Sequence, residues 1–201
     1  MPEPTRWDER YAKGDTPWET GQPSSELQRV LAKASIQPCR ALELGCGTGA
    51  SAVWLDQQGF DVTALDLSPS AIDRARQRAD EAGVCVNFLV ADVLKPPTDL
   101  VGPFDFFFDR GCYHVVRRDD VAAYLATLRR LTRPGTLGLV LTGNARERHE
   151  PGPPVVAEEQ LRAELGALFD IIRLREFRFD QSVADDKRFL GWSCLLRRHD
   201  L

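Results

Sequence analysis

The sequence predicts an α/β protein with a doubly wound, mainly parallel sheet of seven strands, helices on both faces and an antiparallel carboxyl-terminal edge. Three observations carry this prediction. Short apolar runs alternate with amphipathic segments from residue 39 onward, as in strand–helix–strand crossovers. The run at 104–108 is almost continuously apolar, which is typical of a parallel strand covered on both faces. The last two apolar runs follow one another without a helix between them, which indicates antiparallel neighbours.

Each predicted element begins or ends at a recognisable signal. Ser24 or Ser25 suits the cap of a helix that ends near Ala34. Glycines end two further helices, and Ser68 followed by Pro69 begins the second of them. The expected strands are 40–44, 62–65, 84–90, 104–108, 136–141, 169–179 and 189–197, and the expected helices are 24–34, 50–58, 69–82, 121–131 and 157–168, with an acidic turn at 184–186.

The length of 201 residues suits a single domain, residues 1–201, with three parts. Residues 1–35 contain three aromatic side chains among Pro and Gly turn signals, which predicts a folded arm or lid without a long helix. Residues 39–141 form the expected ligand-binding core. Residues 142–201 provide a polar loop and the last strands, which we expect on the substrate side.

Composition and charge exclude several classes of protein. The chain has 26 Lys and Arg against 30 Asp and Glu, a net charge of −4, so it lacks the overall positive charge of a nucleic-acid-binding protein. No stretch approaches the ~18 consecutive apolar residues of a membrane span, and we expect a cytoplasmic protein without a membrane partner. The five cysteines are scattered without a CxxC pair, so neither a disulfide framework nor a metal site is expected.

The segment Glu43–Gly49, with the sequence ELGCGTG, connects the first strand to its helix. Ligands bind at this position in doubly wound folds, because glycines let a ligand approach the main chain and the helix start offers free N–H groups. A dinucleotide-binding GxGxxG motif would need glycine where Ala50 stands. The GxGxG spacing is instead typical of proteins that bind S-adenosylmethionine, although a bare glycine turn is a weak signal.

Two carboxylates follow the second and third strands. Asp66 lies 21 residues after Gly45 and can accept hydrogen bonds from both hydroxyls of a cofactor ribose. Its structural alternative is to cap the next helix, a role that Ser68 already fills. Asp92 can accept a hydrogen bond from an adenine amino group, and alone it could equally be a loop or capping residue.

The set of ELGCGTG, Asp66 and Asp92 resembles the class I S-adenosylmethionine-dependent methyltransferases over about residues 39–141. A narrower resemblance, to the thiopurine, thiol and halide methyltransferases, covers most of the chain. It rests on WDERY at 7–11, TPW at 16–18 and DRGCYH at 109–114. It implies a Rossmann-like methyltransferase fold and S-adenosylmethionine as the cofactor. In that group an aromatic arm folds over the cofactor and closes the site.

The resemblance also implies which residues contact the cofactor. Tyr11 stands where the plant halide enzymes usually carry Trp. The structural alternative for the three aromatic residues of the arm is a satellite hydrophobic cluster that does not serve as a cofactor lid. The expected cofactor contacts are Trp7, Tyr11, Trp18, Glu43, Gly45, Cys46, Gly47, Thr48, Gly49, Asp66, Leu67, Asp92, Val93 and Asp109.

No catalytic dyad is evident in the sequence. Asp109 ends the fourth strand beside the expected methyl group, so a purely structural role is not expected for it. His114 is a second candidate for a base, and the alternative is a loop histidine whose hydrogen bonds are already made within the protein. Cys112 has no adjacent base that would make it a nucleophile. The residues expected to border the methyl acceptor are Arg110, Tyr113, His114 and Arg146, because they follow the fourth and fifth strands.

These features favour methyl transfer by in-line displacement to a small soft nucleophile, which is a thiol, a thiopurine-like compound or a halide. An acceptor that is already ionised needs little base catalysis, which agrees with the missing dyad. The alternatives are an O- or N-methyltransferase of a small metabolite and a cofactor-binding protein without catalysis. A nucleotide-dependent oxidoreductase is disfavoured by Ala50. The oligomeric state is not predictable from the sequence.

We expect the substitution Asp66→Ala to weaken cofactor binding strongly, because it removes the carboxylate proposed to hold the ribose. Calorimetric titration with S-adenosylhomocysteine measures the effect. An affinity equal to that of the unmodified protein would contradict the predicted site.

Overall fold

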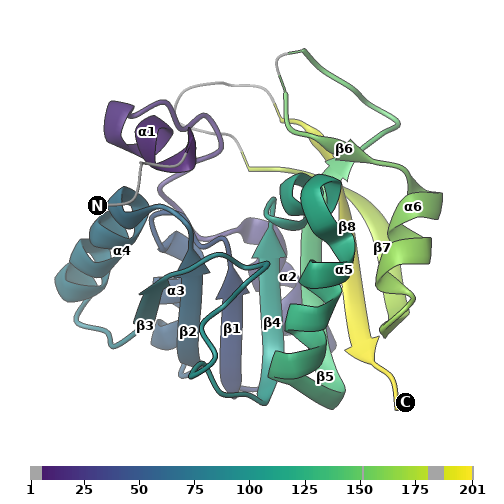
Figure 1. Cartoon of the computed structure of the whole chain (residues 1–201), viewed down its shortest axis with the longest axis horizontal. Coiled ribbons are helices and arrows are strands. Elements are labelled where there is room, and N and C mark those ends of the chain that lie inside the picture. Colours follow the sequence, from purple (N-terminus) through teal and green to yellow (C-terminus); the bar gives the residue numbers. More distant parts are fainter. Residues whose placement is uncertain (1–5, 151, 181–187, 201) are drawn as a thin grey trace.

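The computed structural model describes residues 6–150, 152–180 and 188–200. A central sheet carries the strands in the order β3-β2-β1-β4-β5-β8-β7, with β6 paired to β5 beside this path (Figure 1). The described elements, in chain order, are α1 (Arg6–Lys13), α2 (Ser25–Ala34), β1 (Arg40–Leu44), α3 (Ala50–Gln57), β2 (Asp61–Asp66), α4 (Pro69–Ala82), β3 (Asn87–Val90), β4 (Phe104–Arg110), α5 (Tyr113–Leu131), β5 (Thr132–Asn144), β6 (Val155–Val156), α6 (Glu158–Leu165), β7 (Phe169–Arg178) and β8 (Leu190–Arg198).

The predicted fold class is confirmed. Strands β1 to β5 pair in parallel, and β8 runs antiparallel to both β5 and β7. Strand β6 is an additional two-residue strand, too short to leave a pattern in the sequence. The predicted acidic turn at 184–186 lies outside the described residues. None of the described helices is long and apolar enough to span a membrane.

Some element boundaries differ from the prediction. The arm contains the short helix α1. Strand β3 begins at Asn87 instead of residue 84. Strand β5 begins at Thr132 instead of residue 136, because a bulge opposite Phe104 and Phe106 absorbs the Pro-Gly segment and keeps the pairing. Helix α5 starts eight residues before the predicted stripe and kinks at Asp120.

Two buried clusters cover the two faces of the sheet. Helices α2, α3 and α4 contribute to one cluster, and α5 and α6 contribute to the other. Strand β4 serves both, since Phe106 and Phe108 join the first cluster and Phe107 the second. This alternation explains the continuous apolar run, because both faces of a central strand are buried. Each fully buried aromatic ring contributes about 2–3 kcal/mol by removal of apolar surface from water.

The predicted helix signals work as expected. Ser24 accepts a hydrogen bond from the amide of Leu27, and Ser68 accepts one from the amide of Ala71 with Pro69 in the first turn. Helix α3 differs, because its N-cap is Gly49 and no side chain of that residue can accept a bond. The first amides of α3 therefore receive no hydrogen bond acceptor from an N-cap side chain.

Strands β1, β2 and β4 end at the same edge of the sheet, and α1 lies above this edge (Figure 1). The arm is attached to α4: the Arg74 guanidinium donates to the carbonyl oxygen of Tyr11 at 2.8 Å, and Arg78 donates to the carbonyl oxygens of Gly21 and Thr48. The fold thus brings the arm and the strand ends to one place.

Two glycines allow a matched test of backbone strain and packing. Both Gly49 and Gly83 have φ near +70°, but a Cβ at Gly49 would lie 2.8 Å from the Cβ of Ala75, whereas a Cβ at Gly83 meets nothing within 4 Å. We expect Gly83→Ala to cost about 1 kcal/mol of unfolding free energy. Gly49→Ala should cost about 3 kcal/mol, since overpacking adds to the strain. Urea denaturation measures both, and equal losses would contradict the packing argument.

Candidate functional site

The carboxylate of Asp66 organises the loop after β1. Its Oδ2 accepts a hydrogen bond from the amide of Gly47 at 2.8 Å, and its Oδ1 accepts one from the amide of Ser68 at 2.9 Å. Burial raises the pKa of Asp66, and these two amide donors oppose that rise. Each carboxylate oxygen keeps a further lone pair, so the same group can still accept hydrogen bonds from a ligand.

Glu43 is a buried carboxylate at the end of β1. Its Oε2 has no hydrogen-bond partner. Burial raises the pKa of Glu43 well above its ordinary value, and the negative charge of Glu19 raises it further. An unpartnered buried polar atom costs free energy, so this position favours a ligand that donates a hydrogen bond or carries positive charge.

The aromatic residues of the arm form one cluster above the glycine loop. The ring of Trp18 packs edge-on against Trp7 and Tyr11, with centroids 5.4 and 5.8 Å apart, and its Nε1 donates to the Tyr11 hydroxyl at 2.9 Å. Tyr11 is only 4% exposed. Its hydroxyl oxygen lies 2.7 Å from where a Cβ of Gly47 would stand. The arm thus covers the glycine loop in this structure, and its contact with the cofactor stays a prediction.

The remaining glycine-loop residues pack closely. Gly45 and Gly49 both have positive φ, and a Cβ at Gly45 would lie 2.7 Å from the Cβ of Cys112. The amide of Cys46 donates to the carbonyl oxygen of Leu65, and its side chain is buried. Thr48 is also buried and contacts the arm through Glu19. The loop therefore has little space for side chains beyond those it carries.

The end of β3 lies beside the end of β2, since Val90 pairs with Asp66. Asp92 follows at this edge, and its Oδ1 accepts a hydrogen bond from the amide of Leu94 at 2.9 Å. Leu67 is 37% exposed, whereas Val93 belongs to the cluster under α5 and α6. Asp66 and Asp92 thus lie at neighbouring strand ends, as the sequence predicted.

Asp109 has a structural role that the sequence analysis did not expect. It is fully buried, and its carboxylate accepts hydrogen bonds from the amides of Cys112 and Tyr113 and from the hydroxyl of Tyr124. It therefore caps the start of α5. Burial raises the pKa of Asp109 to about 7, against the lowering effect of these donors. The contact of Asp109 with the cofactor stays a prediction.

Tyr113 connects two helices. Its side chain is fully buried against Tyr124, and its hydroxyl donates to Glu164 of α6 at 2.7 Å. Arg117 pairs with the same carboxylate. This placement gives Tyr113 a packing role between α5 and α6, and it lends no support to the predicted contact with the methyl acceptor.

Arg110 and His114 lie close together after β4. The Arg110 guanidinium donates to the carbonyl oxygen of Trp18 at 3.2 Å and lies 5.4 Å from the ring centroid of Phe179. Burial lowers the pKa of Arg110. His114 is buried, and its Nδ1 accepts a hydrogen bond from the amide of Gly143 at 3.1 Å. Burial first, and then the charge of Arg110, lower the pKa of His114 to about 3.

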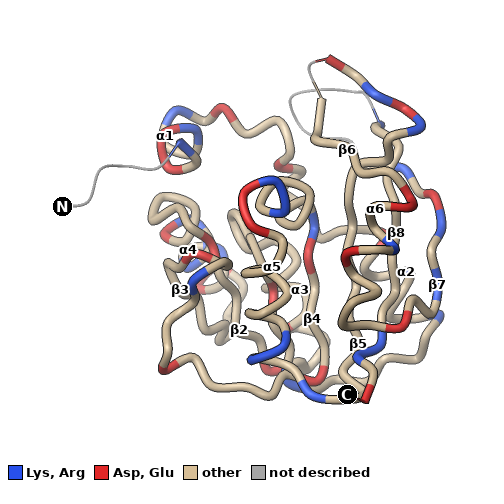
Figure 2. Tube along the Cα trace, turned by 45° about the vertical axis from the view of Figure 1, so that its right-hand side comes forward, with Lys and Arg blue, Asp and Glu red and all other residues tan. Residues whose placement is uncertain are grey.

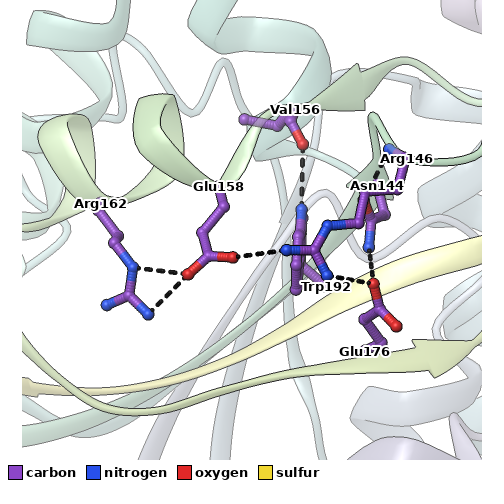
Figure 3. A network of polar contacts seen from close by, with 7 residues as sticks. All are labelled: Asn144, Arg146, Val156, Glu158, Arg162, Glu176 and Trp192. Carbon is purple, nitrogen blue, oxygen red and sulfur yellow. Dashed lines mark hydrogen bonds and ion pairs between the residues drawn. The ribbon is translucent and has the colours of Figure 1, made fainter.

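Arg146 belongs to a network at the end of β5 (Figure 3). Its guanidinium pairs with Glu176 at 2.9 Å and Glu158 at 3.2 Å and lies over the ring of Trp192. Asn144 is fully buried, donates to Glu176 and accepts from the amide of Arg146. The network fixes the start of the polar loop, and Arg146 is held there by two carboxylates.

Three residues that the sequence analysis missed attach the arm to the site. The Oδ1 of Asp8 accepts hydrogen bonds from the hydroxyl of Ser68 at 2.7 Å and from the amide of Ser70 at 2.9 Å. Arg78 donates to Thr48 and Gly21. Glu19 binds Thr48 directly. Two of them had a signal in the sequence, because Asp8 lies inside the segment 7–11 and Glu19 directly follows the segment 16–18.

The charges of the site fit S-adenosylmethionine. Acidic side chains gather at or above the strand ends, and they include those of Glu19, Glu43, Asp66, Asp92 and Asp109. The guanidinium of Arg110 is a cation at this place, and its charge interacts with the carboxylates of Asp180, Glu19 and Glu43. The cofactor carries a sulfonium and an ammonium group, and the unpartnered oxygen of Glu43 can accept a hydrogen bond from the latter.

Comparison with known proteins agrees with this arrangement. The family model for thiopurine S-methyltransferase matches residues 2–195. The 2-heptyl-1-hydroxyquinolin-4(1H)-one methyltransferase of Mycobacteroides abscessus is 31% identical over 149 residues, which are 73% of this chain and 65% of that protein. The tRNA 5-carboxymethoxyuridine methyltransferase of Escherichia coli K12 is 33% identical over 130 residues, 60% of this chain and 46% of that protein. The chain thus spans about half to two thirds of the length of these relatives.

A solved structure is similar over nearly the whole chain. It was described for the conversion of a disulfide bond into a thioacetal group during echinomycin biosynthesis. It superimposes with a TM-score of 0.81 at 29% identity, covering 96% of this chain and 91% of that one. Together with the family match over almost all residues, this shows that the chain belongs to the thiopurine S-methyltransferase family of S-adenosylmethionine-dependent methyltransferases.

Proposed function

We propose that the chain transfers the methyl group of S-adenosylmethionine to a small, soft, anionic nucleophile such as a thiolate or a thiopurine. When bound, the cofactor supplies an electrophilic methyl group on its sulfonium. The protein then has to hold the acceptor in line with the breaking bond and exclude water, and such positioning can lower the barrier by about 7–11 kcal/mol. Family membership supports the reaction type, and the surroundings of Arg110 support the acceptor class.

The surroundings of Arg110 are the observation that supports an anionic acceptor. A guanidinium has five N–H donors, and among the described residues the hydrogen bond of Arg110 goes to a single carbonyl oxygen, that of Trp18. The side chain lies beneath the arm, beside Phe179 and at the end of β4. The negative charges of Asp180, Glu19 and Glu43 already act on it, and its unused N–H donors favour one further acceptor group, such as an anionic ligand. A thiolate or another ionised acceptor would satisfy them.

Neither candidate base is arranged to remove a proton from an acceptor. The Nδ1 of His114 accepts from the amide of Gly143, so the ring proton of the neutral imidazole is on Nε2 and no nitrogen lone pair remains free. The Asp109 carboxylate is fully buried under α5 and already accepts from two amides and a tyrosine hydroxyl. A site without a base suits an acceptor that is ionised before it binds.

The remaining residues of the site would hold the cofactor. Asp66 and Asp92 at neighbouring strand ends suit the ribose and the adenine amino group. Glu43 suits the ammonium group, and the glycine loop offers its main chain. Tyr11 and Trp18, which cover the loop, would exclude water from the reacting atoms.

O-methylation of a small acidic metabolite is the second candidate, because one relative is named for a hydroxyquinolone acceptor. That acceptor class can also meet Arg110 as an anion. A tRNA acceptor has less support, although another relative is named for one. Lys and Arg are interspersed with Asp and Glu along the described trace (Figure 2), and the net charge of −4 does not favour a phosphate backbone.

The Arg110 proposal predicts a charge-dependent acceptor site. We expect Arg110→Gln to raise the KM for an aromatic thiol about tenfold or more, because the thiolate loses its cationic partner. Arg110→Lys should keep most of the affinity. Initial rates with S-adenosylmethionine and a panel of thiols, phenols and amines measure the effect. An unchanged KM in Arg110→Gln, or an amine as the fastest acceptor, would sink the proposal.

The second prediction concerns His114. Thiol methylation should survive in His114→Ala, because the ring is neutral and its acceptor nitrogen is already used. The ring also links stability to pH. Its folded-state pKa of about 3 lies below the ordinary value of 6.5, so its stabilisation is complete above pH 6.5 and is lost as the pH falls toward 3.

Urea denaturation at pH 7.5 and pH 4.5 tests this linkage. The loss of unfolding free energy caused by His114→Ala should be smaller at the lower pH. An equal loss at both values, or a loss of thiol methylation in the folded variant, would contradict the assignment.

A further inference from the structure

We infer that Glu19 is a positioning residue that fastens the arm to the glycine loop and makes the site prefer the cationic cofactor over its uncharged thioether product. The inference rests on S-adenosylmethionine as the cofactor and is independent of the acceptor. Neither the aromatic motifs nor the glycine motif assigns a role to this side chain.

Glu19 joins three groups of the site. Its Oε2 accepts a hydrogen bond from the Thr48 hydroxyl at 2.6 Å, and its Oε1 accepts from the Thr48 amide at 3.4 Å. Its Oε1 also accepts from the Tyr11 hydroxyl at 3.2 Å. The same oxygen would touch a Cβ at Gly47, so the carboxylate lies directly on that glycine. One carboxylate therefore connects the arm aromatic cluster with the loop where the cofactor binds.

The other attachments of the arm reach different places. Asp8 binds Ser68 and Ser70 at the start of α4, and Arg74 holds the main chain of Tyr11 from the side of α4. Arg78, which belongs to α4, donates to the carbonyl oxygens of Gly21 in the arm and Thr48 in the glycine loop. Among the described residues of the arm, Glu19 is thus the one whose charged side chain is bonded to the glycine loop.

The glycine loop needs such a partner. The N-cap of α3 is Gly49, which has no side chain, and the Asp66 carboxylate already takes the amide of Gly47. Glu19 supplies an acceptor to the next amide, that of Thr48, from a distant part of the chain. A negative charge near a helix start is favourable, so the Glu19 carboxylate also stabilises α3.

The charge of Glu19 acts beyond its hydrogen bonds. It raises the pKa values of Glu43 and Asp66 and opposes the lowered pKa of Arg110, so its field extends over the strand ends. A sulfonium in this field is attracted, whereas a thioether carries no charge. Product formation removes one positive charge from the ligand. The Glu19 carboxylate therefore stabilises bound S-adenosylmethionine more than bound S-adenosylhomocysteine, and this difference favours release of the product.

The test compares binding of S-adenosylmethionine and S-adenosylhomocysteine by calorimetry without acceptor. In Glu19→Gln, which keeps the size of the side chain, the affinity for S-adenosylmethionine should fall about fivefold more than that for S-adenosylhomocysteine. In Glu19→Ala, which also loses the hydrogen bonds, both affinities should fall by about tenfold or more. Glu9→Gln removes a carboxylate from the same arm that contacts Lys13, and it should change neither affinity more than about twofold.

A double-mutant cycle separates the Glu19–Thr48 contact from a general effect on the arm. Thr48→Val removes the hydroxyl donor, so Glu19→Ala combined with Thr48→Val should bind no more weakly than Glu19→Ala alone. Additive losses, or an equal loss for both ligands in Glu19→Gln, would overturn the inference. Tighter binding in Glu19→Ala would also overturn it, because Glu19 would then compete with the cofactor. If the unmodified protein bound neither ligand, the cofactor assignment itself would fail.

Discussion

The two hydrogen bonds of the Asp66 carboxylate are the interaction on which the site depends. One oxygen holds the amide of Gly47 and the other holds the amide of Ser68, so the glycine loop after β1 and the start of α4 keep a fixed relation. The arm then attaches to both partners. Asp8 accepts from the hydroxyl of Ser68, and Glu19 accepts from the residue that follows Gly47. Loss of this one carboxylate would therefore affect the loop, the helix start and the arm together.

In the proposed function, negatively charged residues lie near the cofactor and a positively charged residue lies near the acceptor. Carboxylates at the ends of β1 and β2 and in the arm favour the positively charged cofactor. In the proposed function, the half-buried guanidinium of Arg110 would provide the partner for an anionic acceptor at the end of β4. His114 stays neutral because burial and Arg110 both oppose its protonation. If the acceptor is a thiolate, methyl transfer converts a cation and an anion into two neutral products, and exclusion of water by the arm would favour this neutralisation of charge.

The sequence predicted the fold and the positions of the glycine loop, Asp66 and Asp92 at neighbouring strand ends, because these depend on local signals, whereas the contacts of these residues with the cofactor stay predictions. Alternation of apolar runs, the Ser68-Pro69 helix start and the ELGCGTG spacing each act over a few residues. Predictions that depend on packing fared less well. Asp109 lies beside Arg110 in β4, and Tyr113 is the first residue of α5. The amide of Tyr113 therefore donates to the Asp109 carboxylate, and the Tyr113 hydroxyl donates to Glu164 of α6. The role of Glu19 depends on a contact across 29 residues of chain, which no local pattern reveals.

Hydrogen exchange with and without S-adenosylhomocysteine tests most directly that one ligand joins the glycine loop, the strand ends and the arm. The account predicts that the ligand slows exchange together at residues 43–49, at 66–68 and in the arm at 7–21, while NAD at the same concentration changes none of them. Protection confined to one of these segments, or equal protection by NAD, would contradict it.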